Sequence, residues 1–240
     1  YAWKFGKVFC QNLKAYYRIA VGMIGRAGTN QGALAAREAV QLWRPRYVLF
    51  CGIAGGLPDP KEKYARPRLG DVIVADTIYG YEYGKLERKF KPRVNWTYRT
   101  DQALLNGARA YAHSDGWREL IKEEPPRECT PHVVSGEIAS GDQVVDDYTN
   151  SFFAQVLKTW PKINAVEMEG AGAAAAIEQA NSLGIPTGFM MIRGISDLPR
   201  AKGKNKGRRE RDAWKTYASD VTAAFIVGWV ADGLPLLPSA

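Results

Sequence analysis

Charged side chains stand at the ends of two apolar runs in this sequence. The run MMIRGISDLP carries Arg193 and Asp197, and the run NAVEMEG carries Glu167 and Glu169. In an open α/β sheet, ligands bind beyond the carboxyl ends of the strands, where such side chains would collect. Carboxyl groups there are candidates for acid–base chemistry. The structural alternative is that Asp197 caps a helix or pairs with Arg193, and that the glutamates are solvated.

Two further strand ends carry small and polar residues, GIAGG at 52–56 and SGD at 140–142. The first lacks the lysine followed by Ser or Thr that a nucleotide P-loop requires, so taken alone it predicts a turn that allows close packing. The second alone predicts an ordinary helix cap. Single motifs therefore do not decide between ligand binding and packing.

The elements that would position these residues alternate along the chain. Apolar runs of strand length are followed by segments with helical spacing, and a cap at Thr29 or Asn30 opens the first helix. We expect a three-layer α/β/α fold with a mostly parallel mixed central sheet, in one domain over residues 1–240. The expected strands lie at 16–25, 46–57, 69–78, 132–142, 163–170 and 186–197, and the expected helices at 29–43, 146–160, 171–184 and 211–233.

Composition limits the classes of protein. The 240 residues are 46% hydrophobic and carry a formal charge of +8, which suits nucleic acid, a membrane surface or a polyanionic small ligand. The apolar runs are too short to span a membrane. Three widely spaced cysteines predict reduced thiols in the cytoplasm. His113 and His132 stand apart in the sequence, so we expect each to be a surface or strand residue and no zinc site.

Taken together, the motifs resemble the nucleoside phosphorylase and nucleosidase superfamily, which includes methylthioadenosine/adenosylhomocysteine nucleosidases. The resemblance runs from about Ile19 to about Val230 and rests on CGIAGGL, LGDVIVAD with YEYGK, SGEIASGDQVV, NAVEMEGAGAA and IRGISD. It implies cleavage of the N-glycosidic bond of a purine nucleoside, without metal or cofactor, by a homo-oligomer.

The resemblance also implies roles for individual residues. Asp197, steadied by Ser196, would protonate or hydrogen-bond purine N7, and Glu169 would accept hydrogen bonds from the ribose hydroxyls. Arg193 would hold the base that activates the attacking water. If 163–170 is a strand, we expect Glu167 to point to the face opposite Glu169, with either a structural role or a contact with the substrate. Other expected substrate-contacting residues are Ile53, Ala54, Gly55, Val144, Val145 and Met168.

Three departures from the family pattern bear on the reaction. Ile53 stands where phosphorylases of the family have a phosphate-holding serine, so water is the expected nucleophile. The valine pair Val144 and Val145 replaces an aromatic and an aliphatic residue around the purine. The family's first strand, with a glutamate that helps to activate water, has no counterpart before Tyr1, which leaves open whether the domain belongs to a longer chain.

A basic run after Asp197 bears on which substrate the protein binds. The run is either a solvated loop or a loop that covers the site, and in the second case its Lys and Arg side chains could bind phosphate groups. The pattern is similar to nucleosidase domains of NLR-type immune proteins, some of which resemble enzymes that destroy ATP. We therefore expect hydrolysis of a purine nucleotide such as ATP, with contacts from Lys202, Lys204, Lys206, Arg208 and Arg209.

Other functions remain open at this point. A methylthioadenosine/adenosylhomocysteine nucleosidase is the first alternative, and a purine nucleoside phosphorylase, which Ile53 disfavours, is the second. A non-catalytic module that senses nucleotides or binds nucleic acid is the alternative outside enzymes. Retention of Asp197, Glu169 and Arg193 together favours catalysis, so nucleic acid is not the expected partner.

Overall fold

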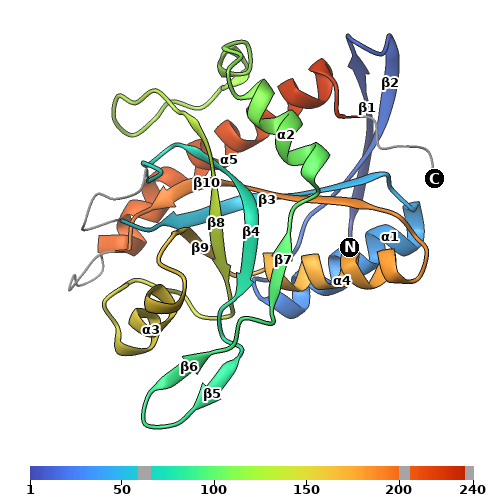
Figure 1. The fold of residues 1–240 in the computed structure, drawn as a ribbon. Coiled ribbons are helices and arrows are strands. Elements are labelled where there is room, and N and C mark those ends of the chain that lie inside the picture. Colours follow the sequence, from blue (N-terminus) through green and yellow to red (C-terminus); the bar gives the residue numbers. More distant parts are fainter. Residues whose placement is uncertain (59–65, 200–205, 236–240) are drawn as a thin grey trace.

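The computed structural model describes residues 1–58, 66–199 and 206–235, and it places helices on two sides of a sheet (Figure 1). Helices α1 and α4 pack against each other on one side, and α2 and α5 lie on the other. The helices are α1 (Thr29–Trp43), α2 (Gln102–Tyr111), α3 (Ser151–Thr159), α4 (Gly170–Ser182), α5 (Lys206–Asp232) and a short 3₁₀ helix, η1 (Arg118–Leu120).

The strands form one main sheet and two separate hairpins. In the main sheet the order is β10-β3-β9-β8-β4-β7, and β10 also pairs with β4. The strands are β1 (Trp3–Cys10), β2 (Ala15–Gly22), β3 (Tyr47–Gly56), β4 (Val72–Gly80), β5 (Gly84–Leu86), β6 (Phe90–Pro92), β7 (Thr97–Arg99), β8 (Val133–Ser140), β9 (Ile163–Glu167) and β10 (Gly188–Asp197).

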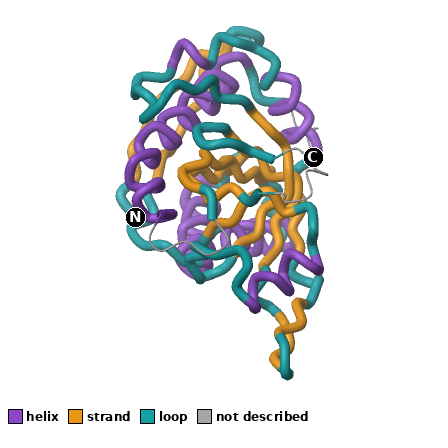
Figure 2. Tube along the Cα trace, turned by 90° about the vertical axis from the view of Figure 1, so that its left-hand side faces the viewer, coloured by secondary structure: helices purple, strands orange, loops and turns teal. Residues whose placement is uncertain are grey.

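The second pairing of β10 closes the sheet on itself. Its residues 192–194 pair antiparallel with β4, while the whole strand runs parallel to β3. The other long ladder, between β4 and β8, is also parallel, whereas β9 meets β3 antiparallel at only two positions. Figure 2 shows the strands enclosed by helices, with the β5–β6 hairpin projecting from the body. The expected mixed α/β/α fold is therefore confirmed.

Burial explains why β10 forms where it does. Every residue of GFMMIRGISD is buried, because α5 packs on one side of this strand and α2 and α4 also contact it. A continuous apolar run is typical of a strand that is covered on both faces. The strand therefore carries its two charged residues, Arg193 and Asp197, inside the protein, where each needs a compensating partner.

Two other expectations concern cysteines and membranes. Cys10, Cys51 and Cys129 are free thiols, as the sequence predicts. Within the described residues, we find no helix with the length and apolarity that crossing a bilayer requires.

Candidate active site

Four strands bring polar residues to one end of the sheet. Asp197, the last residue of β10, pairs in register with Gly55 of β3, and Ser140 of β8 pairs with Glu167 of β9. Gly55 in turn lies opposite Val166, which joins the two pairs across the β3–β9 contact. The four strand ends that the sequence singled out thus meet at a single edge.

Asp197 lies in surroundings that favour its protonated form. Its side chain is buried, and the Ser196 hydroxyl donates a hydrogen bond of 2.7 Å to its Oδ1. Burial raises the pKa of Asp197, while the Ser196 bond and the nearby Arg211 lower it. Because burial is the largest of these effects, the carboxyl holds its proton to a higher pH than an exposed aspartate does. It can therefore act as a proton donor.

The second set of charged residues at this edge consists of two glutamates around one arginine. The guanidinium of Arg193 contacts the Glu167 carboxylate and lies 3.2 Å from Oε2 of Glu169. It also lies 4.9 Å above the ring of Phe50. Burial raises the pKa of Glu169, the Arg193 charge lowers it, and the Glu167 charge raises it again. The cluster therefore keeps a partly exposed carboxylate beside a buried ion pair.

The expectation that Glu167 and Glu169 point to opposite faces is wrong. Residues two apart in a strand share a face, so alternation does not separate these two glutamates, and the Arg193 guanidinium contacts both. Strand β9 ends at Glu167, and Glu169 is the N-cap residue of α4. Glu167 also accepts hydrogen bonds from the backbone N–H groups of Glu169 and Gly170, at 3.0 and 2.9 Å. It thereby fixes the turn that carries Glu169. Met168, half-buried, lies within this turn.

The glycine-rich end of β3 lies against the same arginine. A Cβ atom at Gly52 would come within 2.0 Å of Nη1 of Arg193, so this position has no room for a side chain. Ile53 is half-buried opposite Gly194, and Ala54 is buried with its carbonyl 3.5 Å from the Ser196 hydroxyl. Residues 53–55 therefore line the edge between Asp197 and the glutamates, and their contact with a substrate stays a prediction.

The other residues that the sequence predicts to contact the substrate differ in how exposed they are. Val144 is 55% exposed in the segment that follows β8, whereas Val145 packs against the core cluster around Phe153. Of the basic residues, Lys202 and Lys204 lie outside the described residues, Lys206 begins α5, and Arg208 and Arg209 are exposed in its first turn.

The start of α5 is tied to the strand end that carries Asp197. The backbone N–H of Leu198 donates a hydrogen bond of 2.9 Å to Oε2 of Glu210. Arg211, one residue further on, is close enough to lower the pKa of Asp197. The sequence does not distinguish Arg211 within the basic run, because no local pattern indicates that it lies near Asp197.

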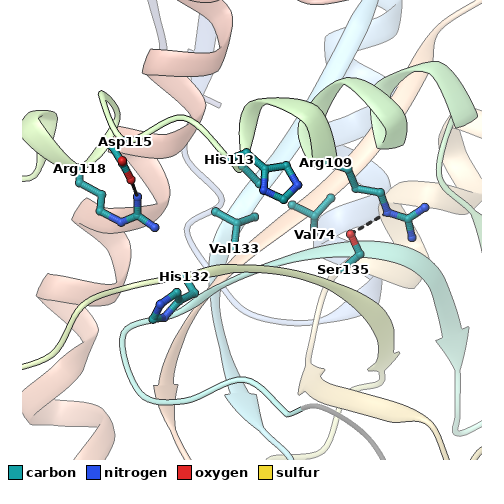
Figure 3. A pocket seen from close by; sticks show the side chains of 9 residues that line it. Val74, Arg109, His113, Asp115, Arg118, His132, Val133 and Ser135 are labelled. Atoms are coloured by element: carbon teal, nitrogen blue, oxygen red, sulfur yellow. Dashed lines mark hydrogen bonds and ion pairs between the residues drawn. The ribbon is translucent and has the colours of Figure 1, made fainter.

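The two histidines share a hollow at the opposite end of the sheet. Figure 3 shows His113 and His132 among the lining residues of a cavity of about 540 Å³, beside the amino ends of β4 and β8. Its two arginines have partners. Arg109 donates to Ser135 Oγ at 2.9 Å, and Arg118 lies 2.5 Å from Asp115. Among the described residues, no group of three or more His, Cys, Asp or Glu side chains is arranged to hold a metal ion.

Comparison with known proteins shows the family and the relatives of this chain. Residues 5–230 match the family model described as the phosphorylase superfamily. A 5′-methylthioadenosine/S-adenosylhomocysteine nucleosidase of Geobacillus sp. is 26% identical over 208 residues, which cover 83% of this chain and 76% of that protein.

Solved structures show the same fold. The methylthioadenosine/adenosylhomocysteine nucleosidase of Neisseria meningitidis, in complex with methylthio-immucillin-A, superimposes with a TM-score of 0.66 at 22% identity, covering 89% of this chain and 81% of that one. The futalosine hydrolase of Helicobacter pylori gives 0.64 at 21% identity, covering 94% and 83%.

Proposed function

The chain belongs to the phosphorylase superfamily, and from this membership we propose that it hydrolyses the N-glycosidic bond of a purine nucleoside or nucleotide. One observation carries the proposal. A buried, hydrogen-bonded Asp197 and a Glu169 carboxylate paired with Arg193 lie at the same edge of the sheet. The nucleosidase relatives support the reaction class.

The two carboxyl groups suit the charges that develop in this reaction. As the bond between C1′ and N9 breaks, positive charge builds on the ribose and negative charge on the purine. Protonated Asp197 would donate its proton at N7, which makes the base a better leaving group. Ionised Glu169 would accept hydrogen bonds from the ribose hydroxyls and stabilise the positive sugar. Burial raises the pKa of both carboxyls, and the Arg193 cation 3.2 Å from Glu169 opposes that rise and favours the ionised form of Glu169.

Water is the proposed nucleophile. Ile53 offers no hydroxyl to hold a phosphate ion at the glycine-rich end of β3. The oxygen of water then bonds to C1′, its proton leaves to solvent or to a nearby base, and the products are free purine and a sugar with a hydroxyl at C1′.

A nucleotide is the proposed substrate within this class. Arg208 and Arg209 are exposed in the first turn of α5, and the Leu198–Glu210 hydrogen bond fixes that turn beside Asp197. Arginine side chains and a helix N-terminus both attract phosphate. Methylthioadenosine, which the name of the Geobacillus relative includes, has an uncharged 5′ group that needs neither. ATP, an immune role and a homo-oligomeric state stay predictions.

Product analysis tests the proposal. Purified protein is incubated with ATP, AMP, adenosine or methylthioadenosine, with and without phosphate, and free adenine is measured by chromatography. We expect adenine from ATP or AMP without added phosphate. Adenine and ribose 1-phosphate that form only with phosphate would contradict hydrolysis. Cleavage of methylthioadenosine alone would favour the nucleosidase alternative, and no release from any of the four would favour a binding module.

A charge substitution tests the nucleotide preference directly. Arg208→Gln combined with Arg209→Gln should raise KM for ATP roughly tenfold, with little change for adenosine, because exposed contacts to phosphate contribute only modestly. The loss should shrink at high salt. Lys215→Gln, an exposed cation further along α5, is the matched control. Equal effects on ATP and adenosine would indicate that Arg208 and Arg209 are solvated and do not contact phosphate.

A further inference from the structure

Asp142 supplies the cap that helix α1 lacks. The N-cap residue of α1 is Gly28, which has φ 130° and no side chain, so the sequence prediction of a Thr29 or Asn30 cap is wrong. Asp142, in the segment after β8, accepts the Thr29 N–H at 2.6 Å and the Thr29 hydroxyl at 3.1 Å. A carboxylate at this place satisfies a backbone N–H that a capping side chain normally would.

Asp142 is itself held from a third element. Oε2 of Glu82, which follows β4, accepts a hydrogen bond of 2.9 Å from the backbone N–H of Asp142. The carboxylates of Glu82 and Asp142 thus form a chain of hydrogen bonds from the end of β4 to the start of α1.

The start of α1 lies directly against Glu169. The backbone N–H of Gly28 faces the Glu169 carboxylate closely enough to lower its pKa. The helices leave no space between them, because a Cβ at Gly32 would lie 2.3 Å from the Glu169 carbonyl oxygen and one at Gly172 would lie 1.7 Å from the Thr29 carbonyl oxygen. A movement of the first turn of α1 therefore moves both the backbone packed on Glu169 and the Gly28 N–H that faces its carboxylate.

We propose that Asp142 is a positioning residue, which holds the first turn of α1 so that Gly28 orients the Glu169 carboxylate for the ribose hydroxyls. The inference rests on the proposed function. Glu169 faces Arg193 from β10, Glu167 from β9 and the Gly28 N–H from α1. Arg193 and Glu167 set its charge environment, and Gly28 is the group that Asp142 controls.

The test compares Asp142→Ala with Asp101→Ala. Asp101 caps α2 through the N–H groups of Ala103 and Leu104, so its loss gives a matched loss of a helix cap away from the site. We expect Asp142→Ala to lower kcat/KM for the purine substrate roughly tenfold to a hundredfold, as displaced catalytic groups do. Asp101→Ala should leave it unchanged. Asp142→Asn, whose side-chain oxygen can still accept the Thr29 N–H, should recover most of the activity.

Two readouts separate positioning from a structural effect. On a Glu169→Gln background, Asp142→Ala should cause no further loss, whereas a purely structural role would add its full loss. The acidic limb of the pH–rate profile should also move to higher pH in Asp142→Ala, because the Gly28 N–H that lowers the pKa of Glu169 is displaced. Additive losses with an unmoved acidic limb would overturn the proposal.

A titration of Glu169 by NMR makes the test independent of turnover. The Glu169 signal is assigned by its absence in Glu169→Gln, and its pKa is measured without substrate in the wild type and in Asp142→Ala. A higher pKa in the variant supports positioning, and an unchanged pKa overturns it. If the wild type cleaves no purine nucleoside, the proposed function fails while this result still decides whether Asp142 acts on Glu169.

Discussion

Arg193→Met tests whether the buried arginine compensates the two glutamates. Arg193 is 3% exposed and Glu167 5%, so methionine would replace the arginine stem but leave a buried carboxylate without its cation. Removing one partner of a buried ion pair costs about 3–5 kcal/mol. In a chain of this size each kcal/mol lowers Tm by about 2–4 °C, so we expect a decrease of about 6–20 °C near pH 8.

The pH dependence of the loss identifies its cause. Arg193 lowers the pKa of Glu169 against the effect of burial, so in the variant the pKa of Glu169 rises further above the unfolded value of about 4.3 and the folded protein is penalised at high pH. The difference from the wild type should shrink as the pH falls toward 4, because a buried carboxyl that takes up a proton no longer needs a cation. Urea unfolding at pH 4 and pH 8 measures both limits.

Two further variants complete this experiment. Arg109→Met removes a largely exposed arginine that lies 3.8 Å from Asp76, and should cost at most about 1 kcal/mol. Adding Glu167→Gln to Arg193→Met removes the buried carboxylate that lacks a cation, and should recover part of the lost stability. An equal loss at pH 4 and pH 8, or a loss no larger than that of Arg109→Met, would refute the ion-pair explanation in favour of packing.

Two other predictions concern the carboxyl groups themselves. Asp197→Asn should reduce base release by roughly 10²- to 10⁴-fold, because an amide cannot donate the catalytic proton. Since the raised pKa of Asp197 penalises the folded state once the group ionises, Asp197→Asn should be more stable than the wild type at pH 8 and equally stable at pH 3; greater instability at pH 8 would contradict this. Glu169→Gln should weaken nucleoside binding in calorimetry and slow turnover by a similar factor, and retention of both would remove Glu169 from the site.

The elements with strong local patterns were predictable from the sequence. Helix α1 begins and ends where its spacing predicts, and β10 follows its apolar run to Asp197. Strand β1, helix α2 and the β5–β6 hairpin were not predicted. Strand β1 mixes lysine and glycine with aromatic residues, and it is stabilised by its partner β2 rather than by an apolar pattern of its own.

The candidate site was predictable only where neighbours in the chain are neighbours in space. Ser196 and Asp197 are adjacent, so their hydrogen bond follows from the motif. Glu167 and Glu169 are two residues apart, which strand alternation alone would place on one face. Their shared contact with Arg193, 26 and 24 residues away, has no local signal. Asp142 and Thr29 are 113 residues apart, and no local signal indicates their contact.

Because β10 closes the sheet, the two sides of the site should differ in how fast their backbone amides exchange hydrogen with solvent. Ile192, Arg193 and Gly194 are paired on both edges of a strand that is buried throughout, so their amides should exchange only when the whole domain opens. Glu169 and Asp142 follow strand ends instead, where smaller openings suffice for exchange. The proposed proton donor, Asp197, thus ends the strand that holds these slowly exchanging amides, whereas the proposed sugar-binding side around Glu169 should exchange faster.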